Sequence, residues 1–235
     1  MIIFITALLF LLLHRERATS KLISQVSIIL GFIPVLIHEV GHALIARLTG
    51  SHVQNIYMVL TPRGQDKTGA QGLAKIVSTS RISNILSTFS GYLFPPVMLG
   101  LGIWSVDTGN SLIYMLIILL LLGFYYLHTS QKYLPVIFIV ILIAFGVTQS
   151  DLIKFISNLD MSVVYNILMG LLLGETVQSV IITSKIYFKN SKTDWDGAAL
   201  KRLTLIPAGA FWAIWTAISA YTVYYTGLTL IQYLV

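Results

Sequence analysis

Long apolar runs separated by short polar segments are the feature that most constrains this chain. Several runs approach or exceed the ~18 apolar residues that are typical of a membrane-spanning helix, and residues 22–37 are almost entirely apolar. Only 10% of the residues are charged, against about 25% in an ordinary soluble domain. Backbone groups in lipid must be hydrogen-bonded within the protein, so these runs predict helices. We therefore expect one integral-membrane domain over residues 1–235.

The runs predict an all-α, polytopic bundle of about seven transmembrane helices. The most polar stretch, residues 50–80, follows the second of them, and roughly alternating apolar residues flank a Pro- and Gly-containing cluster at residues 62–69. This pattern predicts a short β-hairpin at the membrane surface, with a plain connecting loop as the alternative. The expected helices are residues 1–13, 21–48, 82–105, 111–127, 133–148, 161–187 and 207–232.

The distribution of Lys and Arg predicts the orientation. With a cytoplasmic N-terminus and seven alternating helices, the loops within residues 46–81, 128–132 and 185–202 carry eleven of the 15 basic residues. This agrees with the excess of positive charge in cytoplasmic loops. The net charge of +6 is therefore explained without nucleic acid as a partner, and no cluster of basic and aromatic residues indicates one.

A His-Glu-x-x-His motif lies near the end of the second apolar run. On a helix, residues four apart share a face, so His38 and His42 can direct their imidazoles to one point. Zinc binds neutral imidazole and, with three protein ligands, keeps a position open for water. Glu39 lies one residue round the helix and can accept the proton of that water. Charged residues at the centre of a membrane helix cost ~2.5–3.5 kcal/mol each, which favours a metal site over a chance pattern.

The third metal ligand is expected to be a carboxylate or another histidine, because the chain has no cysteine. The candidates are Asp196, Asp194, Glu175 and the remaining histidines. Asp196 is favoured because Asp196-Gly197 precedes the last apolar run, where the carboxylate would lie at a helix N-terminus beside a glycine. An ordinary N-cap aspartate is the alternative interpretation of Asp196, and Asp194 is the second choice as ligand.

Two other features of the apolar runs each have two possible interpretations. Glu175 and Gln178 lie three apart on one face of the predicted sixth helix. An intramembrane carboxylate is a functional candidate, but hydrogen bonding to a neighbouring helix would also explain it. Pro34, one turn before the motif, predicts a kink that serves either packing or the aiming of the histidines.

At these residues the chain resembles the site-2 protease family of intramembrane zinc metalloproteases. The His-Glu-x-x-His segment is similar to the zinc-binding helix of that family. Two further segments are similar to signatures of its compact bacterial branch, namely Asp196-x-x-x-Leu200-x-x-x-Thr204-x-x-Pro207 and Ser90-Gly91-Tyr92-Leu93. The resemblance implies Zn²⁺ as cofactor, an Asp-Gly pair as third ligand and a bacterial plasma membrane. It also implies a locally unwound transmembrane segment as substrate. The Asn-containing, Pro-rich loop of longer members is missing ahead of the Asp-Gly pair.

The sequence therefore predicts a zinc-dependent intramembrane endopeptidase with its active site toward the cytoplasmic side. The metal ligands would be His38, His42 and Asp196, Glu39 would be the general base, and the partners would be a membrane-protein substrate and the lipid bilayer. A catalytically inactive relative acting as a binding or scaffold protein is the main alternative, although that role does not require Glu39. A transporter with Glu175 in an ion path is the other, but the chain shows no obvious internal repeat.

Overall fold

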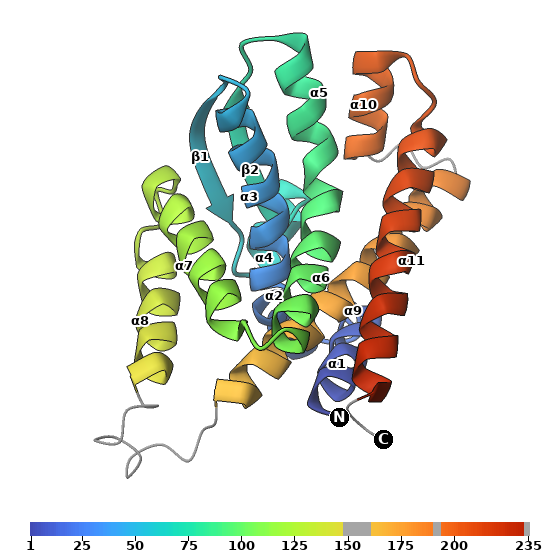
Figure 1. The fold of residues 1–235 in the computed structure, drawn as a ribbon. Coiled ribbons are helices and arrows are strands. Elements are labelled where there is room, and N and C mark those ends of the chain that lie inside the picture. The colour runs from blue at the N-terminus through green and yellow to red at the C-terminus, as the bar shows by residue number, and fades with distance from the viewer. Residues whose placement is uncertain (148–160, 190–193, 233–235) are drawn as a thin grey trace.

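The computed structural model describes residues 1–147, 161–189 and 194–232 (Figure 1). Within them, helices dominate and one two-stranded antiparallel sheet lies beside the bundle. The elements are α1 (Ile2–Arg15), α2 (Lys21–Leu30), α3 (Phe32–Leu48), β1 (His52–Met58), α4 (Pro62–Thr68), β2 (Gly72–Val77), α5 (Arg81–Ser90), the 3₁₀ turn η1 (Gly91–Leu93), α6 (Phe94–Asp107), α7 (Ser111–His128), α8 (Tyr133–Val147), α9 (Met161–Phe188), α10 (Asp196–Thr204) and α11 (Ala208–Gln232).

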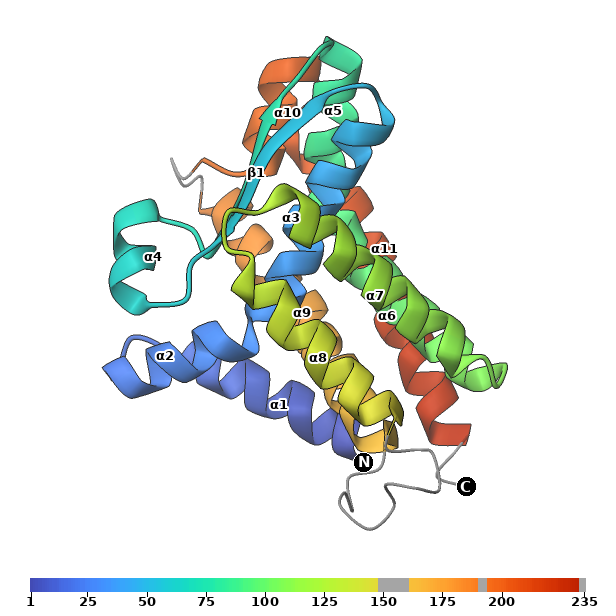
Figure 2. The ribbon, with the colours of Figure 1, turned by 90° about the vertical axis from the view of Figure 1, so that its left-hand side faces the viewer.

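Helix α3 is central to the bundle. It packs against both strands, against α5 and η1, and against α6, α7 and α9. Its buried Leu36, Val40 and Ala43 belong to the main apolar core, together with Leu99 of α6 and Leu172 of α9. Helices α2 and α4 project to one side of the bundle (Figure 2). The motif helix is therefore held on several sides at once.

The number of candidate membrane spans is lower than the sequence predicted. By length and composition, two segments of the described chain qualify, Arg81–Asp107 and Val163–Phe188, and α2 with α3 makes a third if the bent pair is one span. Helix α1 is apolar but has only 14 residues, or roughly 21 Å at 1.5 Å per residue, against a hydrocarbon core of ~30 Å. The described residues thus support two or three spans rather than seven. Residue 148, the predicted end of the fifth helix, lies outside them.

The second predicted helix is broken at Gly31, where α2 and α3 meet at a bend of 51°. Pro34 lies in the first turn of α3 and has no backbone N–H with which to continue the helical ladder. Gln71 Nε2 donates a hydrogen bond of 2.7 Å to the Ile28 carbonyl and so satisfies a backbone acceptor beside the break. The kink predicted from Pro34 is confirmed.

The predicted hairpin is also confirmed, with a helix in place of the expected turn. Strands β1 and β2 are antiparallel, with His52 opposite Val77 and Met58 opposite Gly72. Between them, α4 starts at Pro62 after the N-cap Thr61 and ends at Gly69, whose φ of 71° suits glycine. The other edge of β1 is covered by the segment at residues 129–131, which bonds backbone groups of Ile56 and Met58.

Helix α1 is short, but it packs closely against the long helix α9. A Cβ atom at Gly170 would lie 2.7 Å from the Ile3 carbonyl oxygen, and one at Gly174 would lie 2.8 Å from the Phe10 ring. Small residues of this kind let two helix backbones approach in a membrane, where packing rather than the hydrophobic effect drives helix association.

Gly170→Ala is expected to lower the thermal unfolding midpoint of the detergent-solubilised protein. Overpacking costs ~1–3 kcal/mol, which outweighs a gain in helix propensity of up to ~1 kcal/mol. Gly123→Ala in α7 is the matched control, because a Cβ atom there would meet nothing within 4 Å, and its midpoint should be unchanged or higher. Equal midpoints for the two variants would contradict the close packing of α1 and α9.

Candidate metal centre

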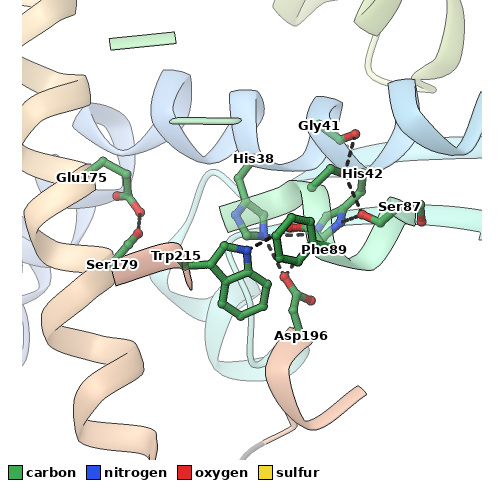
Figure 3. Close-up of polar contacts among 10 residues, drawn as sticks. His38, Gly41, His42, Ser87, Phe89, Glu175, Ser179, Asp196 and Trp215 are labelled. Atoms are coloured by element: carbon green, nitrogen blue, oxygen red, sulfur yellow. Dashed lines mark hydrogen bonds and ion pairs between the residues drawn. The ribbon is translucent and has the colours of Figure 1, made fainter. Parts of the chain in front are cut away.

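The two histidines of α3 meet side by side (Figure 3). Their Nε2 atoms are 3.0 Å apart, and the rings stand nearly perpendicular, at 86°. The side chains are largely covered, with 21% of His38 and 12% of His42 exposed. Two imidazole nitrogens are thus directed to one point from adjacent turns of one helix.

Asp196 is brought to the same point by the first turn of α10. Its Oδ2 atom lies 3.5 Å from His38 Nε2 and 3.4 Å from His42 Nε2, and the three candidate ligand atoms all lie within 4.8 Å of one another. Oδ2 is buried and has no hydrogen-bond partner, which is unfavourable for a carboxylate oxygen. A cation among the three atoms would satisfy it, and two imidazoles with one carboxylate form a donor set that zinc uses in catalytic sites.

The charge of Asp196 suits this role. Burial alone would raise the pKa of the Asp196 carboxyl, but the two neighbouring imidazoles, His42 above all, hold it well below its usual range. The carboxyl group is therefore ionised at neutral pH, which is the form that a metal requires.

Backbone and hydroxyl groups of α5 orient His42. Its Nδ1 donates a hydrogen bond of 2.7 Å to the Ser87 carbonyl, which leaves Nε2 free to ligate. Ser90 Oγ donates to the Gly41 carbonyl at 2.9 Å and to the Ser87 carbonyl at 2.7 Å, and so links the two helices. Sequence reasoning missed Ser87 and Ser90 in these roles, because serine is common and both contacts join residues more than 40 positions apart.

The close approach of η1 requires glycine at position 91. A Cβ atom on Gly91 would lie 2.3 Å from His42 Nε2 and 2.8 Å from His38 Cε1. The next residue, Tyr92, places its ring edge-on to His38 with the centroids 4.8 Å apart. The segment Ser90-Gly91-Tyr92 therefore forms one wall of the centre.

An aromatic cluster positions α10. Trp195 lies against Tyr92 and Trp215, with ring centroids 6.4 and 6.1 Å apart, and Trp215 Nε1 donates to the Phe89 carbonyl at 3.0 Å. Trp195, not Asp196, is the N-cap of α10, so the N-cap interpretation of Asp196 is wrong. Asp196 also opens a separate short helix, because the last long helix begins only at Ala208.

The other candidates lie outside the three-residue cluster. Asp194 is exposed and pairs with Arg202 at 2.9 Å. Glu175 of α9 accepts a hydrogen bond of 2.7 Å from Ser179 Oγ. His14 and His128 each hydrogen-bond through Nδ1 to a carbonyl one turn back, and His52 lies on the exposed side of β1.

Glu39 is buried on α3 beside the start of β2. The residue is 8% exposed, and a Cβ atom on Gly72 would lie 2.6 Å from Glu39 Cγ and 2.8 Å from its Oε1. Glu39 is not one of the three clustered groups. Glu39 is therefore not placed among the groups that could hold a cation.

Comparison with protein families gives one match. A family model described as Peptidase M50B-like matches residues 1–226, a range that includes every residue of the centre. Comparison with curated proteins and with solved structures gave no match.

Gly91→Ala is expected to weaken the binding of a divalent metal ion such as Zn²⁺ by about 10-fold to 100-fold, in the range found for residues that orient metal ligands, because the new methyl group displaces His42. Competition with a chelator of known affinity measures the change. Gly100→Ala in the same helical segment is the control, since its Cβ atom would meet only Thr222, at 3.6 Å. Unchanged affinity in Gly91→Ala would contradict the arrangement of the two imidazoles.

Proposed function

The chain belongs to the M50B-like peptidase family, and we propose that it is a zinc-dependent endopeptidase that cleaves membrane-embedded protein segments. The observation that carries this proposal is that the ligand atoms of His38, His42 and Asp196 converge. The Asp196 oxygen among them, Oδ2, is buried and has no hydrogen-bond partner. Two observations support a substrate in the membrane. The chain belongs to a family of peptidases, and it has apolar candidate spans at Arg81–Asp107 and Val163–Phe188.

The proposed reaction is hydrolysis of a peptide bond. His38 and His42 would hold the metal through Nε2, and Asp196 through Oδ2. Zinc, when bound, supplies a Lewis acid that polarises the scissile carbonyl and lowers the pKa of water toward ~7. Glu39 accepts a proton from the water whose oxygen bonds to the carbonyl carbon. It then gives that proton to the amine nitrogen as the C–N bond breaks.

The sheet suggests how a substrate would be presented. In the part of the chain that the structure describes, β2 pairs with β1 alone, while the far edge of β1 is covered by residues 129–131. Gly72, the first residue of β2, abuts Glu39. A transmembrane segment that unwinds exposes backbone groups that need partners, and addition to the edge of β2 would supply them next to the general base.

We place the centre toward the cytoplasmic side of a bacterial plasma membrane. The C-terminal end of α3, the N-terminal end of α5 and helix α10 lie at one end of the molecule (Figure 1). These segments carry Arg47, Arg81, Lys201 and Arg202. Basic residues gather on the cytoplasmic side of membrane proteins, and α3 and α10 are also the helices that carry the three clustered residues.

Glu39→Gln is expected to reduce cleavage of a model transmembrane substrate by about 10²–10⁴-fold, the range for loss of general acid–base catalysis. Zinc per chain should stay unchanged, because Glu39 does not ligate. Glu16→Gln, at an exposed carboxylate beyond α1, is the control and should cleave normally. Zinc in the wild-type protein with no cleavage of any tested substrate would instead favour an inactive relative that acts as a scaffold.

Asp196→Asn is expected to lower bound zinc below one per chain and to abolish cleavage, because it removes the charged ligand. Asp194→Asn makes the same chemical change two residues earlier, at an exposed side chain paired with Arg202, and should retain both zinc and activity. Chelation of the wild-type protein should abolish cleavage reversibly, with recovery on addition of Zn²⁺. The proposal fails if chelated protein cleaves at the original rate.

A further inference from the structure

The two histidines of the centre differ in the support that they receive. His42 donates its Nδ1 proton to the Ser87 carbonyl, which fixes the tautomer that leaves Nε2 for a metal. Across the described residues, no acceptor lies within hydrogen-bond distance of His38 Nδ1, and the only polar contact of the His38 ring is at Nε2. Metal-ligating histidines almost always donate the second ring N–H to a carboxylate, a carbonyl or a water.

Besides Asp196 of α10, Glu175 of α9 is a second carboxylate on the His38 side of the centre. It lies on α9, within the candidate span Val163–Phe188. Figure 3 shows the Glu175 side chain extending from α9 on the side of His38, with its carboxylate turned to Ser179, while Asp196 approaches the His38 ring from a different side. Glu175 and His38 are close enough to interact electrostatically. Its one hydrogen bond in the described chain is from Ser179 Oγ to Oε1, at 2.7 Å, so the carboxylate has acceptor capacity to spare.

A role in binding the cation directly does not fit Glu175. The three groups whose ligand atoms converge are His38, His42 and Asp196, without Glu175. A carboxylate inside a membrane span is costly, and a single serine hydroxyl offsets only part of that cost. A second donor, the imidazole N–H of a metal-bound histidine, would complete its hydrogen bonding.

We propose that Glu175 is a positioning residue of the metal centre, which accepts the Nδ1 proton of His38. The bond forms through one bridging water or after a change of the Glu175 rotamer. The carboxylate holds His38 in the tautomer with Nε2 free and makes that nitrogen a stronger metal ligand. This role rests on the proposed zinc site, but it does not depend on which substrate is cleaved.

The test is the zinc affinity of the full chain in detergent, measured by competition with a chelator. Glu175→Leu is expected to bind zinc about 10-fold to 100-fold more weakly, and Glu175→Gln, which keeps an acceptor oxygen, should lie between it and the wild type. Gln178→Leu is the matched control, because it also removes a polar group from the same face of α9 and should leave the affinity unchanged. Thermal unfolding midpoints of the metal-free proteins identify any variant that fails to fold.

A second measurement reports on the ligand itself. With Co²⁺ in place of zinc, the visible absorption spectrum should change in Glu175→Leu and not in Gln178→Leu, since only the first alters the orientation of His38. The inference would be overturned if Glu175→Leu bound zinc with wild-type affinity and gave an unaltered Co²⁺ spectrum. If that variant also lost cleavage activity, Glu175 would instead act on the substrate. A wild-type protein that binds zinc and cleaves nothing would refute the peptidase proposal, while the affinity series would still decide the role of Glu175.

Discussion

At Gly91 the backbone passes so close to the two imidazoles that a methyl group there would overlap His42. This approach brings Ser87 within hydrogen-bond distance of His42 Nδ1 and Tyr92 against the His38 ring. Tyr92 in turn belongs to the aromatic cluster that positions α10 and its aspartate. The close contact between α3 and the α5–η1 segment therefore orients His42 and joins the histidines, through Tyr92, to the aromatic cluster beside α10.

The centre concentrates polar groups in a molecule that otherwise avoids them. Imidazoles and carboxylates are unfavourable in an apolar bundle unless they are paired or bind a cation. The structure pairs some of them within the protein, as with His42 and Ser87 or Glu175 and Ser179. Asp196 Oδ2, in contrast, makes no hydrogen bond and lies 3.5 and 3.4 Å from the Nε2 atoms of His38 and His42. That contrast favours a bound cation over a purely structural role for the cluster.

The hairpin segment contacts both halves of the bent helix pair α2–α3. Gln71 bonds the Ile28 carbonyl at the bend between α2 and α3, and the next residue, Gly72, abuts Glu39. The first residue of β2 therefore lies beside Glu39, the residue that we propose transfers the proton. The sequence predicts the kink from Pro34, but the side chain that bonds the backbone at the bend, Gln71, comes from the distant segment between α4 and β2.

The sequence alone determined what depends on local spacing and residue type. It indicated a helical membrane protein with a kink at Pro34, a hairpin over residues 50–80, a histidine pair on one helix face, and Asp196 as the favoured third ligand ahead of Asp194. It overestimated the spans, because apolar composition does not distinguish a crossing helix from a short one packed against another, as α1 packs on α9. Only the tertiary structure showed that Asp196 rather than Asp194 reaches the histidines, that Ser87 bonds His42, and that Glu175 lies on the side of His38. Those contacts join distant segments, and the packing of helices, rather than any motif, brings such segments together.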